Sequence, residues 1–458
     1  MFTTVCAPAK VPAKELVEDA RAASKRDPCP VLAKIARAPL SSADSPLYRV
    51  LFDNDYTLGV KTEFAGVGGM PRYPFFSPKS LLEKLSRTGY FHKAAGVSTG
   101  SATETLAGFW QRFAQLHPGH PIFSQYLDLG RVIPYYMHGD GGRGFKKDPV
   151  YIFSFMPALG MGSRAHPVEV SGAASSASSR AAPGVAPEFG INLRGHSATT
   201  RFLFTVLPHK VDKSHPAAFD DLLSLWGRKL GNLLADGFQG PGGRDAAPFR
   251  IAVLGLTGDA PFLKRAGRFT RSFANVRKTA SSRADQPGCC WLCLAGKESA
   301  AASYAFERLG YDDSYCTWIP TCGVEAPWRA PGVLLQHILH DESRAEAWYR
   351  PDLFHIYHAG VGKDFVASSL TYAMQALYQA GGLQRNLARL NVDLKSYLRR
   401  TRGTSLHCGA LTAPLLGCMS SRDFPKGHWS KSLDTAVLMK FLAVLLQQPA
   451  HQAVVAQD

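Results

Sequence analysis

The sequence predicts a mixed α/β domain whose central elements follow in the order strand, strand, strand, helix, strand. Three observations lead to this fold class. Four runs of β-branched and aromatic residues have the length of buried strands. They cover residues 131–138, 149–156, 200–207 and 249–256. A helical pattern lies between the third and fourth runs, and Asp140 and Asp259 follow the first and fourth. Helical patterns before and after this set predict helical flanking regions.

Composition and charge restrict the classes of protein to consider. The chain has 458 residues, of which 45% are hydrophobic, and a formal net charge of +16. This length predicts two or three domains, and the charge favours polyanionic partners, nucleic acid first and an anionic membrane second. No apolar run is long enough to span a membrane, and the N-terminus lacks the pattern of a secretory signal. We therefore expect a nuclear or otherwise intracellular protein that is not secreted.

The chain divides into four regions by composition. Residues 129–380 form the predicted core, with a Ser/Ala/Gly-rich insert at 170–187 and a Cys-containing insert at 285–331. The remaining regions are a basic, partly disordered arm at 1–45, a helical region at 46–128 and a helical C-terminal region at 381–458.

The elements of the core can be justified in chain order. The first strand ends in the polar segment 139–144, which predicts a turn before the second strand. The helix at 216–238 carries a broad apolar stripe that suits packing on a sheet, and 239–243 ends it with three glycines and a proline.

The flanking helices rest on the same kind of pattern. Before the core, Ser77-Pro78 starts one helix, and 103–116 forms another with Leu106, Phe109, Phe113 and Leu116 on one face. After it, helices are predicted at 365–380, 383–400 and 431–446.

Asp140 and Asp259 are the candidate catalytic pair. Two-metal phosphoryl transfer requires carboxylates from different strands that converge on hard cations, and strand ends hold them rigidly. The alternative is structural, because Asp is a favoured turn residue and Gly258-Asp259-Ala-Pro can be a loop. Residues 138–144 also resemble a phosphate-binding loop, but no helix follows them.

Cys290 and Cys293 have the spacing of half a zinc site. Further ligands could come from Cys289, Cys316, Cys322, Asp352, His355 or His358. Asp352 and His355 would lie one helical turn apart in a helix, where they could bind a metal or where Asp352 could orient His355. Buried free thiols and a core histidine are the structural alternatives. The nine cysteines of a chain this long predict reduced thiols rather than a disulfide scaffold.

Three basic segments are candidates for nucleic-acid contact, because Lys and Arg alternate there with aromatic residues. Their basic residues are Arg143, Lys146 and Lys147; Lys264, Arg265, Arg268 and Arg271; and Arg399 and Arg400. We expect salt-dependent binding of DNA to weaken when the residues from Lys264 to Arg271 are neutralised. The alternative for each segment is a solvated helix face.

The ordered set of Asp140, Asp259, Cys290-x-x-Cys293 and Asp352-x-x-His355 resembles the catalytic core of cut-and-paste DNA transposases of the CACTA and related superfamilies. The resemblance covers about residues 130–440. It implies a ribonuclease-H-like fold in which the strands of Asp140 and Asp259 lie side by side and parallel, sharing Mg²⁺ in an active protein. It also implies DNA as partner, a structural Zn²⁺ on Cys290 and Cys293, and an origin in a transposable element. Homo-oligomer formation is left open.

The third acid of that family is a Glu, and this chain has none after Glu346. Asp364 and Asp434 are the candidates to replace it, with Asp434 in a Lys-x-x-Asp segment that resembles the family. Capping of a helix is the alternative for both. We therefore expect a decayed or repurposed transposase with weak or absent cleavage. The other functions kept open are a non-catalytic DNA-binding or scaffold protein on the same fold, and an unrelated α/β hydrolase or transferase that uses 139–144 as an anion loop.

Overall fold

The computed structural model describes most of the chain. The described residues are 12–25, 29–54, 59–143, 148–162, 190–194, 200–243, 245–273, 286–298, 303–306, 316–378, 381–401, 406–420, 423–448 and 451. The insert predicted at 170–187 lies outside them, as do Lys146 and Lys147. Within the described residues, no helix is both long and apolar enough to span a membrane.

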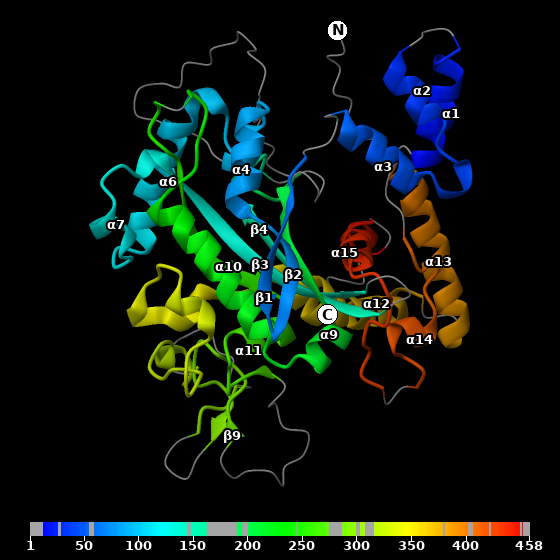
Figure 1. The fold of residues 1–458 in the computed structure, drawn as a ribbon. Helices are drawn as coiled ribbons and strands as arrows, with labels where there is room; N and C mark the ends of the chain where they lie inside the picture. The colour runs from blue at the N-terminus through cyan, green and yellow to red at the C-terminus, as the bar shows by residue number, and fades with distance from the viewer. Residues whose placement is uncertain are drawn as a thin grey trace, which may run out of the picture.

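A five-stranded mixed sheet forms the centre of the molecule (Figure 1). Its strands, in spatial order, are β11 (Tyr349–Pro351), β8 (Arg250–Gly258), β3 (Val132–Arg143), β4 (Pro149–Pro157) and β7 (Phe202–Pro208). β4 runs antiparallel to both β3 and β7, whereas β8 runs parallel to both β3 and β11. The prediction of a mixed α/β fold is therefore confirmed. The short edge strand β11 has no counterpart among the predicted strands.

The predicted turn at 139–144 is wrong for the residues that the structure describes there. β3 continues through Arg143, and its pairing with β4 runs without interruption from Gly139–Phe153 to Arg143–Pro149. The glycines serve close packing at this point: a Cβ on Gly139 would lie 1.9 Å from the ring of Phe262. A phosphate-binding or oxyanion loop needs a turn whose N–H groups point toward the anion. Residues 139–143 are extended and paired with β4, so they do not form such a loop.

Helices cover both faces of the sheet. Alternate β3 side chains face opposite ways. Tyr135 and Met137 join a large core with α10 (Ala218–Ala235) and α4 (Pro78–Arg87), whereas Val132 joins a smaller one with Trp110 of α6 (Ala102–Leu116). Trp110 Nε1 donates to the Val132 carbonyl at 2.7 Å. The helices predicted to start at 77, 103 and 216 thus form. In the second of them Leu116, predicted on the apolar face, is exposed, whereas Trp110 is buried.

The described residues at the N-terminus contain three α-helices. Helices α1 (Ala13–Ala23), α2 (Pro30–Ala36) and α3 (Asp44–Asp53) pack around a small core of their own. The arm predicted at 1–45 thus contains α1, α2 and the start of α3. The region predicted as helical also contains a hairpin of β1 (Thr62–Val67) and β2 (Met70–Phe76).

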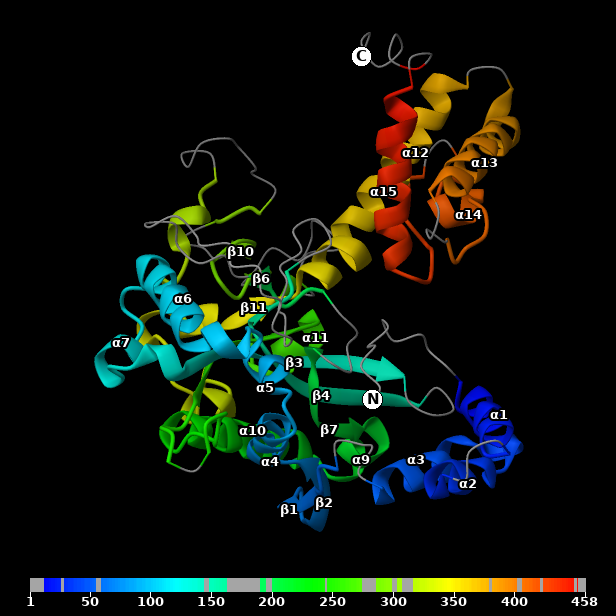
Figure 2. The same cartoon turned by 90° about the horizontal axis from the view of Figure 1, so that it is seen from above.

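The C-terminal helices form a separate unit, which Figure 2 shows standing apart from the sheet. α12 (Gly362–Leu377), α13 (Gly382–Arg400), α14 (Ala413–Leu416) and α15 (Leu433–Leu446) share one apolar core that begins at Val366. The boundary predicted at 381 therefore lies about one helix too late.

Shorter elements complete the fold. They are α5 (Phe91–Ala95), α7 (Ile122–Gln125), α9 (His209–Ser214), α11 (Ala260–Ala266), the π-helical segment η9 (Phe354–Val361), the pairs β5 (Leu159–Gly160) with β6 (Gly190–Ile191) and β9 (Gln286–Pro287) with β10 (Lys297–Glu298), and the 3₁₀ turns η1 (Leu40–Ser42), η2 (Thr99–Ser101), η3 (Leu129–Arg131), η6 (Ile319–Thr321), η7 (Val333–Gln336) and η8 (Glu342–Trp348).

Burial of His120 beneath α6 predicts a pH-dependent stability. Desolvation lowers the pKa of His120 from 6.5 to about 4, against the attraction of Asp341. A depressed histidine pKa stabilises the fold above pH 6.5 and loses that contribution as pH falls toward 4, by about 3 kcal/mol. Urea unfolding across this range should show the loss. His120→Asn, which keeps an acceptor for the Ile122 N–H, should flatten the profile; an unchanged profile would contradict this assignment.

Candidate active site

The sheet places Asp140 and Asp259 at neighbouring positions. Gly139 of β3 pairs with Gly258 of the parallel strand β8, and each glycine is followed by one of the aspartates. A Cβ on Gly258 would lie 2.2 Å from the Gly139 carbonyl oxygen, so only glycine permits this approach. Asp259 also begins α11, where its Oδ1 accepts a hydrogen bond from Phe262 N at 2.8 Å. Asp259 therefore both caps α11 and lies beside Asp140 in the candidate site.

Asp352 and His355 lie beside the same aspartates. Asp352 follows β11 directly, and its Oδ1 accepts from the Phe354 N–H at 2.8 Å. His355 Nδ1 lies 3.0 Å from Asp352 Oδ2, while His355 Nε2 lies 3.8 Å from Asp140 Oδ1. His138 of β3 approaches Asp352 Oδ2 to 3.7 Å. The result is a chain of titratable groups from Asp140 through His355 to Asp352 and His138.

The pKa values of this group shift in different directions. Burial raises the pKa of Asp140, and the nearby His355 and His138 only partly oppose it. Burial acts the same way on Asp352, but the interactions with His138 and His355 and the Phe354 N–H outweigh it and lower its pKa. The hydrogen bond to Asp352 raises the pKa of His355. Asp352 is thus the stable anion of the group, and it holds His355 in a fixed orientation.

Asp140 Oδ1 is buried and has no hydrogen-bond partner. A buried carboxylate oxygen without a donor is costly unless a cation or a proton reaches it. Mg²⁺ is commonly held by one or two carboxylates together with water and substrate phosphate, so Asp140 with Asp259 fits such an ion chemically. Among the described residues, no three His, Cys, Asp or Glu side chains already form an arrangement that would hold a metal. Substrate oxygens or water would have to complete the ligand set.

The structure does not bring Asp434 or Asp364 into this group. Asp434 is buried at the start of α15, where its Oδ1 accepts from His407 Nδ1 at 2.8 Å and from the His407 backbone N–H. Asp364 lies in the first turn of α12 and accepts from Gly427 N. Neither caps its helix, and both fasten loops of the C-terminal unit. Asp352 is the acid beside Asp140 that the sequence motif assigned to a zinc site.

Cys290 and Cys293 come together in the turn after β9. The hydrogen bond from Cys293 lowers the pKa of Cys290 to about 6 despite burial. Cys289 Sγ donates elsewhere, to the Ala295 carbonyl. The pair fits half of a tetrahedral zinc site, and the described residues supply no third donor in a metal-binding arrangement. The predicted Zn²⁺ therefore stays a prediction, which metal analysis of the purified protein and of Cys290→Ser can test.

The basic stretch after Asp259 is largely used inside the protein. Arg265 makes two hydrogen bonds to the Asp212 carboxylate and lies over the Phe219 ring. Arg268 pairs with Asp220 at 2.6 Å, and Arg271 is 2% exposed. The guanidinium groups of these arginines thus already have partners inside the protein, and their role in DNA binding stays a prediction. α11, the helix that carries Lys264 and Arg265, ends at Ala266.

The other predicted basic residues differ in their exposure. Arg399 and Arg400 lie exposed at the end of α13. Lys264 is half-buried on α11. The side chain of Arg143, like Lys146 and Lys147, lies outside the described residues.

A cavity of about 640 Å³ opens beside the acidic group. Asp259, Asp352 and His355 form its polar part, and Cys290 and Trp291 contribute to the lining. Its surface is mostly apolar. Cys290 and the Asp352–His355 pair, which belong to the two halves of the predicted zinc set, thus both border this cavity. Sequence reasoning missed the cavity, because it forms only where the Cys-containing insert folds back over β8 and β11.

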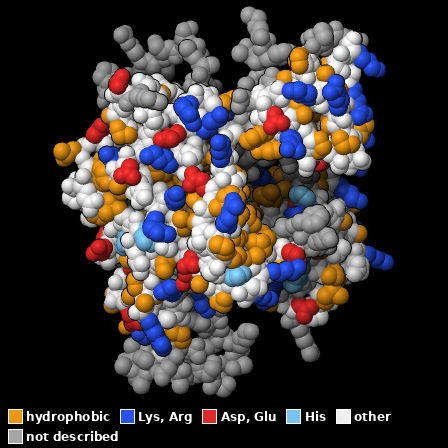
Figure 3. Space-filling model, in the orientation of Figure 1, with side chains coloured by type: hydrophobic (Ala, Val, Ile, Leu, Met, Phe, Trp, Pro, Cys, Tyr) orange, Lys and Arg blue, Asp and Glu red, His pale blue; other side chains and the backbone are white. Residues whose placement is uncertain are grey.

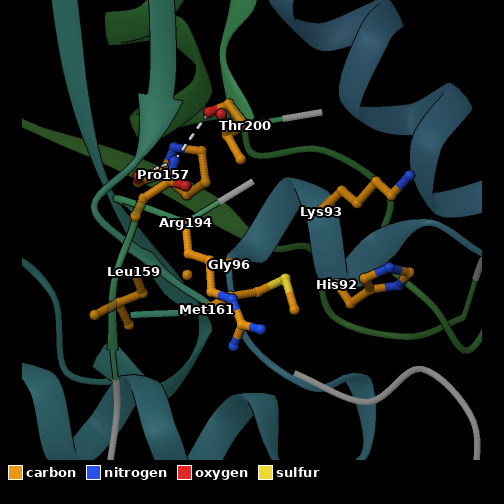
Figure 4. Close-up of a pocket in the computed structure, with 10 residues that line it drawn as sticks. His92, Lys93, Gly96, Pro157, Leu159, Met161, Arg194 and Thr200 are labelled. Carbon is orange, nitrogen blue, oxygen red and sulfur yellow. Dashed lines mark hydrogen bonds between the residues drawn. The ribbon is translucent and has the colours of Figure 1, made fainter. Parts of the chain in front are cut away.

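A smaller cavity of about 250 Å³ lies at the other end of β4 (Figure 4). Figure 4 shows His92 and Lys93 from α5 on one side and Pro157 and Leu159 from the strands on the other. Tyr135, which pairs with Pro157, is five positions from Asp140 along β3, roughly 17 Å. This cavity is therefore separate from the acidic group.

Comparison of the chain with protein-family models, curated proteins and solved structures gives no match. The function of the site is accordingly inferred from its own geometry.

Proposed function

We propose that the protein is a transposase-like DNA-binding protein that cleaves or transfers phosphodiester bonds with Mg²⁺ at Asp140 and Asp259. One observation carries the proposal: the two aspartates follow paired glycines on neighbouring parallel strands at the centre of the sheet. The order β11-β8-β3-β4-β7, with β4 alone reversed relative to its two neighbours, supports the finer assignment to a ribonuclease-H-like fold.

The side chains have distinct tasks in this proposal. Asp140 and Asp259 would hold Mg²⁺, which supplies charge neutralisation at the scissile phosphate and a more acidic attacking water or 3′-hydroxyl. Asp352 fixes His355 through its Nδ1, so that Nε2 faces Asp140. The imidazole can then take or give a proton beside the carboxylate. The apolar lining of the cavity limits water around these groups.

Nicking of supercoiled plasmid DNA by the full chain tests the proposal. We expect cleavage in Mg²⁺ or Mn²⁺ and none in EDTA. Binding of duplex DNA without any nicking would favour the non-catalytic DNA-binding protein. Asp352 counts against that alternative, because it provides a third carboxylate close to Asp140 and Asp259. Its oxygens, however, accept hydrogen bonds from His355 and Phe354.

The cavity is the one feature that favours the remaining alternative, a hydrolase or transferase for small apolar substrates. The anion-binding loop that this alternative requires does not form at 139–143, because these residues belong to β3. An Asp352–His355 pair at an apolar cavity could still act as a base. Hydrolysis of nitrophenyl esters by the wild type, lost in His355→Ala and without any DNA nicking, would favour this alternative over the proposed function.

A further inference from the structure

The solvent face of α13 carries a continuous set of positive charges. Arg385, Arg389, Lys395, Arg399 and Arg400 are all exposed. At 3.6 residues per turn they fall within an arc of about 140°, opposite the buried residues Leu387, Leu390 and Leu394. Figure 3 shows Lys and Arg side chains along the edge of the molecule where Figure 1 places this helix. We call these five residues the α13 basic face.

The residues between the charges leave the face open. Ala388 and Ser396, both exposed, are small, and exposed Val392 lies among them. No acid lies within the arc; Asp393 sits at its margin, where its carboxylate accepts from Tyr378. The distance from Arg385 to Arg399 is about 21 Å along the helix, or about six base pairs of duplex at 3.4 Å each.

The surrounding unit does not neutralise these charges. Residues 362–448 contain 11 Lys and Arg but only four acids, Asp364, Asp393, Asp423 and Asp434. Each of these acids accepts a hydrogen bond from a neutral group or from a histidine. By contrast, Arg265, Arg268 and Arg271 of the core all have carboxylate partners. Among the described residues, no ion pair with a carboxylate engages a cation of the α13 basic face.

We propose that the α13 basic face binds the phosphate backbone of a nucleic-acid duplex. This inference deepens the proposed function, because it names a surface that would hold DNA. Five cations on one rigid helix match a row of phosphates, and counterion release from the duplex would drive association. Because the helix is held by its opposite face, binding needs no rearrangement of the unit. The surface carries no base-reading pattern, so the binding expected is independent of sequence.

The test is a matched pair of variants of the full chain. Arg385→Gln, Arg389→Gln and Lys395→Gln together remove three charges from the α13 basic face. Arg49→Gln, Lys213→Gln and Arg228→Gln remove three from exposed positions elsewhere. Binding of a labelled DNA duplex is measured over a series of salt concentrations. The α13 variant should lose at least about tenfold in affinity, with a salt slope smaller by roughly 3, and the control should stay near the wild type.

Other outcomes overturn the inference. Equal losses in both variants would show only an effect of net charge, and no loss in either would place the contact elsewhere. Loss of binding to phosphatidylserine vesicles with duplex binding unchanged would make the face a membrane contact. If the α13 variant fails to fold by circular dichroism, duplex protection of Lys395 from acetylation in the wild type decides the question: no protection overturns the inference.

The two proposals fail separately. Binding through α13 without nicking would refute only the catalytic proposal. Nicking with binding unaffected by the α13 variant would refute only the present one.

Discussion

Asp140→Asn is expected to abolish Mg²⁺-dependent nicking, and Asp352→Asn to reduce it about 10- to 100-fold, the usual cost of losing an orienting partner. In Asp140→Asn the buried Oδ1, which has no protein donor, loses the charge that would hold the cation. In Asp352→Asn a neutral amide takes the place of the carboxylate that fixes His355 through Nδ1. The rate of plasmid nicking per folded molecule is the measurement.

Asp434→Asn is the matched control. Asp434 is also an aspartate and is more deeply buried, but its partner is His407 in the C-terminal unit. We expect lower stability and an unchanged nicking rate per folded molecule. A loss of cleavage in Asp434→Asn with none in Asp352→Asn would restore Asp434 as the third acid. The expectation of weak or absent activity rested on a missing acid, and the position of Asp352 removes that premise without testing activity itself.

Arg271→Met is expected to destabilise the protein by about 1–3 kcal/mol, the range for leaving a buried hydrogen-bonding group without its partner. Arg271 is 2% exposed and joins two segments of the Cys-containing insert. Its Nε donates to the Cys290 carbonyl at 3.0 Å, and its Nη2 donates to the Glu325 carbonyl at 2.6 Å. A methionine fills similar space but leaves these acceptors without donors, which is costly in a buried site.

Urea unfolding of Arg271→Met, Arg271→Lys and Lys264→Met measures this effect. Lysine keeps the charge but cannot reach both segments, so an intermediate loss is expected. Lys264 is half-buried and makes no ion pair among the described residues, and its replacement should change stability by less than about 0.5 kcal/mol. If Arg271→Met were fully stable and yet weakened DNA binding, Arg271 would be a surface contact after all.

The strands of the core could be read from the sequence because each is a local pattern. Residues 149–157 and 250–258 are nearly continuous apolar runs, which is what strands covered on both faces require. β11 could not be predicted from the sequence, because three residues are too few to show a periodicity. This strand is defined by its parallel pairing with β8. The turn predicted at 139–144 is wrong because glycine is a local turn signal, whereas Gly139 is required here by the close approach of the Phe262 ring.

The charges show the same limit. Sequence counts established the excess of +16, but composition cannot say which cations have partners. Arg265 and Arg268 are neutralised by Asp212 and Asp220, which precede them by about 50 residues and become neighbours only through the fold.

The sequence by itself determined the mixed α/β class, most of the helices, and the aspartates that follow the first and fourth predicted strands. These depend on periodicity and on the residues at element ends, which are local properties. The resemblance implied parallel neighbouring strands for Asp140 and Asp259. The tertiary structure alone decided that Asp352 and His355 join Asp140 while Asp434 does not, and that Arg265 and Arg268 pair with acids. Each of these is a contact between segments far apart in the chain, and side-chain spacing along one segment carries no information about it.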